Sequence, residues 1–212
     1  MKLASLAAAA AGLSLLASAA GAVTIVNGDF ESGPTVGGAG YTTLSAGSSA
    51  LPGWTIGGDS IDYIGSYWTA ESGTHSLDMS GNAPGSISQT VTGLTVGQSY
   101  TVTFYLSGNP AGGDPNKELE LQAPGITGYY FIVGANEFTL PGITWYKEDL
   151  IFQAVSSTAN LTFTSLENSA YGPALDNVTI SVPELTTWAL MIGGLGLVGY
   201  SLRRRASRTA IA

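Results

Sequence analysis

The sequence predicts an all-β fold, a β-sandwich whose strands are arranged as a jelly roll. Between Val23 and Val182, no stretch shows a sustained helical period in its apolar residues. Instead, short runs rich in β-branched and aromatic residues recur between clusters of Gly, Pro, Asn and Ser, a pattern typical of antiparallel sandwiches. About ten such runs in a domain of roughly 160 residues favour a jelly roll over an immunoglobulin-like sandwich.

The clearest strand runs from Ser99 to Leu106, where every second residue is large and apolar. Successive side chains of a strand point to opposite faces, so this alternation predicts one buried and one exposed face. The Gly- and Ser-rich span from Ser32 to Ser49 is too long for a hairpin and is expected to be a mobile surface loop. The other expected strands are Thr24–Val26, Gly53–Ile56, Ser60–Ile64, Ser76–Met79, Ser86–Val91, Glu118–Gln122, Tyr129–Val133, Lys147–Ala154, Asn160–Thr164 and Asn177–Val182.

The first 22 residues have the composition of a secretory signal peptide. Lys2 precedes an apolar run from Leu3 to Leu16, and small residues follow at the spacing that signal peptidase accepts. Cleavage after Ala22 is expected, with cleavage after Ala19 as the alternative. The β-sandwich domain would then occupy residues 23–182, on the exported side of the membrane.

The C-terminal segment has an apolar run from Thr186 to Leu202, followed by arginines. Its length is near the roughly 17–25 residues that a transmembrane helix needs, and the arginines would hold its end in the cytoplasm. Residues 183–208 as a whole are similar to the PEP-CTERM sorting segment of Gram-negative bacteria. The residues that carry this similarity are Pro183, Glu184 and Leu185 in the place of a Pro-Glu-Pro signature, and the cluster Arg203, Arg204 and Arg205.

This similarity implies that an exosortase processes the chain and that the product reaches the cell surface or an exopolysaccharide matrix. Leu185 replaces the second proline of the signature, so sorting is expected and cleavage is left open. An ordinary tail anchor in the inner membrane is the alternative.

The charge of residues 23–182 excludes several classes of partner. Fourteen carboxylates face two lysines, a net charge near −12. Such a surface repels nucleic-acid phosphates and favours solubility and divalent cations. The chain contains no cysteine, so neither disulfides nor thiolate chemistry contributes.

Catalytic motifs are weak, and no enzyme activity is predicted. His75 is the single histidine, and it is interpreted as a residue at the start of a strand. Glu118 and Glu120 share one face of a strand, as a glycosidase pair would, but Lys117 beside them suits an exposed, solvated strand. Asp59 and Asp62 would point to opposite faces.

Aromatic side chains are the stronger functional signal. Wide rings with polar edges can cover the apolar faces of sugars while amides and carboxylates bind the hydroxyls. In each adjacent pair of rings, one is expected to enter the core and the other to form a binding platform; Trp54 is expected to be a buried anchor. The candidates are Tyr67, Trp68, Tyr129, Tyr130, Trp145 and Tyr146.

Several segments resemble, in the same order, the bacterial choice-of-anchor C family, whose domains are similar to galactose-binding-like jelly rolls. The resemblance implies a β-sandwich that binds sugars without a defined enzyme activity. The segments are Asn27–Glu31, Leu51–Trp54, Ser60–Ile64, Ser76–Gly81, Pro84–Gln89, Tyr100–Gly108 and Gly172–Val178.

The resemblance also implies a structural calcium between the first and last strands. By position, Glu31 and Asp176 would supply carboxylate oxygens and Asn27 a carbonyl oxygen, with Asp29 as a weaker candidate. The alternative is that these acids accept hydrogen bonds from turns.

Three functions remain open from the sequence. The first is a non-catalytic surface or matrix protein that binds polysaccharide, with exopolysaccharide as the expected partner. The second is a secreted carbohydrate-active enzyme, and the third is a structural surface protein without a sugar site.

Overall fold

The computed structural model describes residues 23–134, 139–183 and 191–198. Within this part of the chain, residues 41–181 contain eleven strands, and the predicted β-sandwich is confirmed. The strands are β1 (Tyr41–Ser45), β2 (Thr55–Gly58), β3 (Ser60–Ile64), β4 (Ser76–Asp78), β5 (Gly85–Thr92), β6 (Ser99–Gly108), β7 (Asn116–Ala123), β8 (Ile126–Gly134), β9 (Tyr146–Gln153), β10 (Thr158–Ser165) and β11 (Pro173–Ser181).

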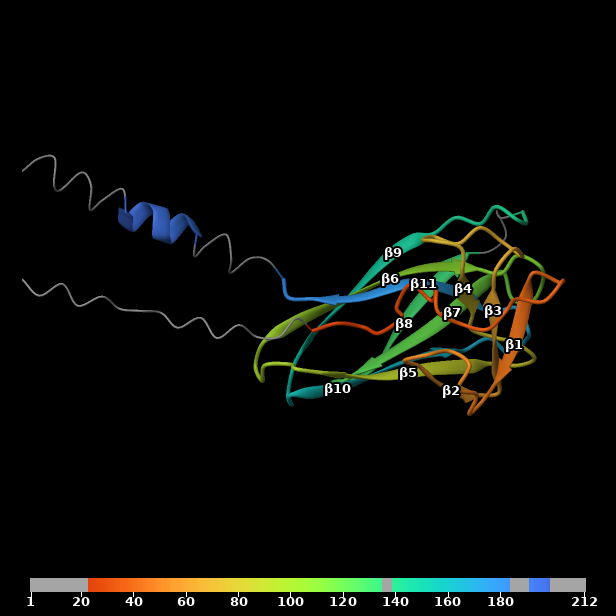
Figure 1. The fold of residues 1–212 in the computed structure, drawn as a ribbon, viewed down its shortest axis with the longest axis horizontal. Coiled ribbons are helices and arrows are strands. Elements are labelled where there is room, and N and C mark those ends of the chain that lie inside the picture. The colour runs from red at the N-terminus through yellow and green to blue at the C-terminus, as the bar shows by residue number, and fades with distance from the viewer. Residues whose placement is uncertain (1–22, 135–138, 184–190, 199–212) are drawn as a thin grey trace, which may run out of the picture.

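The strands form two antiparallel sheets. One has six strands in the order β1-β3-β4-β11-β6-β9, and the other has five in the order β2-β5-β10-β7-β8. From β4 onward, nearly every connection carries the chain from one sheet to the other, as in a jelly roll. In Figure 1, β2, β5 and β10 lie below β9, β6 and β11, so the two layers are seen nearly edge-on.

The core lies between the sheets and follows from the period-two pattern of the strands. In β6 the even-numbered residues Tyr100 to Leu106 are buried, and in β10 Leu161 and Phe163 are buried. The Phe104 ring contacts those of Phe131 and Phe163 on the opposite sheet, with centroids 4.9 and 5.3 Å away. Phe104 therefore joins the two sheets at the centre of the core.

The outer face of the six-stranded sheet is also partly buried. All five residues of β3 are buried, which no strand with a solvent-facing side would show. Ile64, Trp68 and Ala174 form a second small apolar cluster there, packed beneath Tyr41, Tyr67, Ile143 and Trp145. Loop residues therefore cover this face of the sheet.

Two sequence expectations about strands were wrong. Thr24–Val26 is not a strand, because the backbone N–H and C=O of Val26 bond the side chain of Gln89 rather than a neighbouring strand. The span from Ser32 to Ser49 is not all loop, since β1 lies within it and pairs in register with β3. The remaining expected strands are present with slightly different ends.

The predicted signal peptide, residues 1–22, lies outside the described residues. Of the predicted membrane segment, residues 191–198 are helical, and the rest is likewise not described.

In the described part of the chain, no helix has both the length and the apolar character needed to span a membrane.

Phe104→Ala should reduce the free energy of unfolding by about 3–5 kcal/mol, because it removes the ring that fills the space between the sheets. Ile151→Ala on exposed β9 should change it by less than about 0.5 kcal/mol. Urea unfolding followed by tryptophan fluorescence measures both. Equal effects of the two substitutions would contradict the assigned core.

Candidate functional site

The segment Gly65–His75, which connects β3 to β4, folds across the outer face of the six-stranded sheet. Trp68 anchors it: its ring is 2% exposed, and its Nε1–H donates to Ser76 Oγ at 2.8 Å. The N–H groups of Gly65 and Tyr67 both donate to the carbonyl oxygen of Gly40, before β1. These contacts fix the position of the Tyr67 ring beside the sheet.

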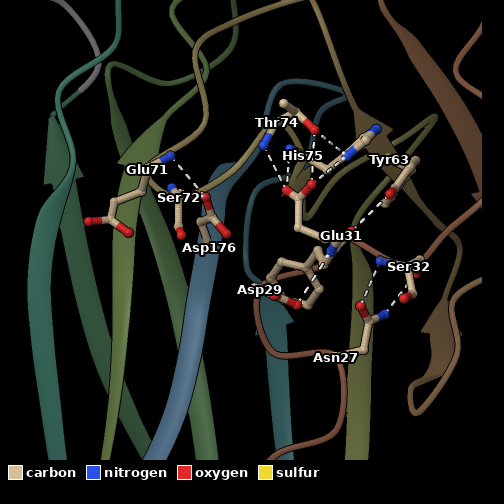
Figure 2. A network of polar contacts seen from close by, with 11 residues as sticks. Asn27, Asp29, Glu31, Ser32, Tyr63, Glu71, Ser72, Thr74, His75 and Asp176 are labelled. Atoms are coloured by element: carbon tan, nitrogen blue, oxygen red, sulfur yellow. Dashed lines mark hydrogen bonds and ion pairs between the residues drawn. The ribbon is translucent and has the colours of Figure 1, made fainter.

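Two carboxylates hold the far end of this segment (Figure 2). Asp176 accepts hydrogen bonds from the N–H groups of Glu71 and Ser72, at 2.9 and 3.0 Å. Glu31 accepts from the N–H groups of Thr74 and His75, both at 2.8 Å. Residues from opposite ends of the domain therefore fasten one loop.

The two carboxylates differ in burial and therefore in pKa. Partial burial alone would raise the pKa of Glu31, but hydrogen bonds from Thr74 and His75 outweigh it and lower the pKa to about 2. At Asp176, which is fully buried, burial outweighs three backbone hydrogen bonds and raises the pKa to about 7.

A hollow of about 190 Å³ lies beside the Gly65–His75 segment, on the outer face of β1, β3 and β4. Its polar floor comes from the sheet, and its walls come from the β3–β4 segment, the end of β6 and the connection before β11. The lining residues are Tyr41, Thr43, Asp62, Ile64, Tyr67, Asp78, Gly81, Asn82, Asn109, Ala170 and Tyr171.

Asp62 and Asp78 are partners on adjacent strands, so their side chains lie on the same face of the sheet. Asp78 is 1% exposed; its Oδ1 accepts from the N–H groups of Ser80 and Gly172, both at 2.9 Å, and its Oδ2 accepts from Asn109 Nδ2 at 2.7 Å. A side chain at position 172 would collide with Oδ1 of Asp78, 2.5 Å from an added Cβ. Asp78 thus joins three segments around the floor.

Asp62 is the less buried of the two carboxylates, 9% exposed against 1% for Asp78. Its Oδ1 accepts a hydrogen bond from Thr43 Oγ1, while its Oδ2 has no donor among the described residues. Burial raises the pKa of Asp62 above its ordinary value, against the opposite effect of the Thr43 bond. Burial raises the pKa of Asp78 to about 7, and the nearby Asp62 charge adds to this increase.

Tyrosine rings form the apolar part of the hollow. The Tyr41 and Tyr67 rings meet edge to face, with centroids 5.4 Å apart and planes at 76°. Tyr171, from the connection before β11, also lines the hollow and is 39% exposed. Rings at the rim and hydrogen-bond acceptors on the floor suit a small ligand with apolar faces and several hydroxyl groups.

Of the predicted platform residues, the structure places only Tyr67 in this hollow. Trp68 is buried beneath it, and Trp145 is half-buried, donating to the carbonyl oxygen of Thr69 at 3.1 Å. Tyr146 is exposed at the start of β9. Trp54 is buried, as expected for an anchor.

The expectation of one buried ring per pair was wrong for Tyr129 and Tyr130. They are 52% and 59% exposed, although Phe131 and Val133, which follow Tyr129 at every second position of β8, are buried. Tyr130 borders a separate open hollow of about 550 Å³, together with Glu120 and Asn160. It is the only aromatic residue in the lining described for that hollow.

Lys117 is buried and not exposed, so that expectation was also wrong. It lies on the inner face of β7 with Leu119 and Leu121, and its Nζ donates to the carbonyl oxygen of Gly112 at 2.7 Å. Burial lowers the pKa of Lys117, against the charges of Glu167, Asp78 and Asp114. Glu118 and Glu120 do share the outer face of β7, as predicted.

His75 has a structural position. Its ring stacks on that of Tyr63, with centroids 4.9 Å apart, and its Nδ1 lies 3.2 Å from Glu31 Oε2. This arrangement agrees with its interpretation as a residue preceding a strand.

Glu31, Asp176 and Asn27, which the resemblance assigns to calcium, all have protein partners. Both oxygens of Glu31 have two partners each, from Thr74 and His75. The carbonyl oxygen of Asn27 accepts from Phe30 N–H and from Trp54 Nε1–H. These contacts are of the kind that the alternative, hydrogen bonding in turns, would give. Across the described residues, no group of three or more His, Cys, Asp or Glu side chains is placed to hold a metal ion.

Sequence reasoning did not identify Tyr41, Asp62, Asp78, Asn82, Asn109 and Tyr171 as site residues. Asp62 and Asp78 do lie within two of the segments that carry the family resemblance. Their period-two position, on the face opposite Ile61, Tyr63 and Leu77, was the available signal. Tyr41 was hidden in the span expected to be a loop.

The fold and site define the chain as a β-sandwich domain with a ring-lined polar hollow on one sheet. Residues 23–181 match the family described as "Protein of unknown function (DUF642)", and the chain belongs to this family. A curated relative, halomucin of Haloquadratum walsbyi (strain DSM 16790 / HBSQ001), is 38% identical over 143 residues, which is 66% of this chain and 2% of that protein. The chain therefore spans a very small part of the relative it matches.

Similar solved structures include two carbohydrate-binding modules. One is TmCBM61 in complex with β-1,4-galactotriose, with a TM-score of 0.46 and 16% identity over 74% of this chain and 96% of that one. The other is a family 16 carbohydrate-binding module, with a TM-score of 0.43 and 16% identity over 74% and 98%. With both TM-scores below 0.5, a function has to be argued from the site itself.

Glu31 should make stability depend on pH in the acid range. Its folded pKa of about 2 lies below the ordinary value of 4.5, so its stabilising effect is present above about pH 4.5 and is lost as the pH falls towards 2. The melting temperature of wild type should exceed that of Glu31→Gln at pH 6, and the gap should close by pH 2. A gap of constant size from pH 6 to pH 2 would contradict the role assigned to the charge.

Proposed function

We propose that the domain is a non-catalytic module that binds polysaccharide through the hollow around Asp62. The observation that carries this proposal is a hollow that combines three tyrosine rings, of which that of Tyr171 is exposed, with Asp62, whose Oδ2 has no donor among the described residues. Sugars present apolar C–H faces and donate hydroxyl protons, and both needs are met within one small space.

The size and rigidity of the hollow support this proposal. A volume of about 190 Å³ is below the roughly 300–1,000 Å³ of sites for drug-sized ligands, and it suits one sugar unit. Asp78 holds the floor through donors from three segments, and the β3–β4 segment is fastened at both ends. Such preorganisation reduces the entropy lost on binding.

A binding role is favoured over hydrolysis because Asp62 and Asp78 differ in burial and in the number of hydrogen bonds that they accept. A glycosidase needs one acid to reach the glycosidic oxygen and the other to reach water or the sugar carbon. Asp78 already has three donors and is fully buried, so it acts as a support. Glu118 and Glu120 lie on the opposite sheet, and Glu120 has a hydrogen bond from Gln122.

We further propose that the protein is exported and acts at the cell surface or in an extracellular matrix, with exopolysaccharide as its ligand. The N-terminal signal-like residues and the segment Pro183 to Arg208 support this, together with the resemblance to the choice-of-anchor C family. Signal peptidase and an exosortase would process the chain, and the apolar run would hold it in the membrane until then.

Calcium at the Asn27, Glu31 and Asp176 positions stays a prediction of the resemblance. If calcium ties these residues together, millimolar calcium should raise the melting temperature relative to chelator, and Asp176→Ala should abolish the difference. An unchanged melting temperature in wild type would refute calcium binding and leave the hydrogen-bonded arrangement as the sole role of these carboxylates.

Tyr67→Ala should weaken binding to polysaccharide at least about tenfold, or 1.4 kcal/mol, because it removes a ring from the wall of the hollow. Affinity electrophoresis against a panel of bacterial exopolysaccharides measures this retardation. Tyr146→Ala is the matched control, since it removes an exposed tyrosine from β9 of the same sheet. Equal retardation of wild type and Tyr67→Ala would refute the proposed site.

A further inference from the structure

The groups that a ligand meets on the floor of the hollow are mainly hydrogen-bond acceptors with negative charge. Oδ2 of Asp62 has no protein donor, and Oδ2 of Asp78 has only the Asn109 amide. A carboxylate oxygen can accept more than one hydrogen bond, so Oδ2 of Asp62 can accept one from a ligand hydroxyl. The buried Asp78 beside it contributes charge to the floor. The floor therefore favours ligand groups that donate hydrogen bonds.

No positive charge balances this floor from within the hollow. The described residues contain two lysines and no arginine. The Lys147 ammonium pairs with Asp149 on β9 at 2.9 Å. Lys117 is buried, with its Nζ at the carbonyl oxygen of Gly112; the charge of Asp78 acts on it, but it does not belong to the lining. His75, the last residue of the Gly65–His75 segment, is held against Glu31.

From these positions, and on the basis of the proposed function, we infer that the hollow selects sugars without acidic substituents and rejects uronates. A hydroxymethyl group can donate a hydrogen bond to Asp62 on the floor. A uronate carboxylate in its place can only accept, and it brings a negative charge next to Asp62. Like charges juxtaposed in a partly desolvated site oppose binding strongly. The expected ligands are neutral or amino-sugar units.

The charge of the whole domain and the charge of the floor both disfavour anionic ligands. The net charge of residues 23–182 is near −12, so anionic polymers are repelled before contact. That long-range repulsion weakens in salt, whereas the effect of Asp62 acts at close contact and is screened much less. The two contributions can therefore be separated by experiment.

Matched sugar pairs test this selectivity on the full-length chain. Galactose, glucose and mannose are each compared with their uronic acid by isothermal titration at pH 8 and 0.5 M salt. This pH lies above the pKa of about 7 that burial gives Asp78. Whichever neutral sugar binds should bind at least about tenfold more tightly than its uronate. Equal or tighter binding of the uronate would overturn the inference while leaving a sugar-binding function intact. No binding by any member would count against the proposed function itself.

Two substitutions show whether the rejection originates in the hollow. Asp62→Asn keeps an acceptor oxygen but removes the charge. It should therefore lower the ratio of neutral-sugar affinity to uronate affinity by about tenfold. Asp149→Asn, which changes the net charge equally on exposed β9, should leave this ratio unchanged. If Asp62→Asn keeps the wild-type ratio of neutral-sugar to uronate affinity, Asp62 is not the source of the selectivity. The same conclusion follows if Asp149→Asn lowers this ratio as much as Asp62→Asn does.

A third variant does not disturb the floor. Asn82 is exposed at the rim, so Asn82→Lys should fold normally and place an ammonium beside the hollow. The ratio of uronate affinity to neutral-sugar affinity should then rise about tenfold over that of wild type. An unchanged ratio, in a variant that still binds the neutral sugar, would contradict the electrostatic origin of the selectivity.

Discussion

The attachment of the Gly65–His75 segment to the outer face of the six-stranded sheet is the constraint on which the hollow depends. Without it, β3 and β4 would have a solvated outer face, and Tyr67 would have no fixed position. The attachment combines the apolar anchor Trp68 with the carboxylates Asp176 and Glu31, each of which accepts two N–H groups of the segment. Because these carboxylates come from opposite ends of the domain, formation of the hollow depends on completion of the whole sandwich.

The buried carboxylates of the site carry an energetic penalty that the core has to offset. Burial raises the pKa values of Asp78 and Asp176 to about 7. Folding therefore favours their protonated forms, and ionisation of each costs stability as the pH rises from about 4 to 7. A carboxylate left partly unsatisfied in a hollow, such as Asp62, does not serve stability. Groups of this kind are often retained for ligand binding, where their need for a donor is met.

The sequence was sufficient to predict the sandwich, because the alternation of large and small residues in strands such as Ser99–Gly108 depends only on local geometry. It was insufficient for β1: Tyr41–Ser45 contains the strand formers Tyr and Thr, but it lies within a Gly- and Ser-rich span, and its pairing with β3 is evident only in the structure. The hollow was only partly predictable: Tyr67 was identified, but Asp62 and Asp78 become neighbours through strand pairing. Lys117 was misjudged because a charge was taken to mean exposure, although its position in β7 alternates with the outer residues.

The most direct test of the account is the location of bound sugar on the domain. Residue-by-residue amide shifts in NMR, recorded while a neutral sugar is titrated into the protein, map the contact surface. If sugar binds in the hollow around Asp62, the largest shift changes should cluster at Asp62, Asn82, Asn109 and Tyr171. Changes centred instead on Glu120, Tyr130 and Asn160, on the outer face of the five-stranded sheet, would contradict it.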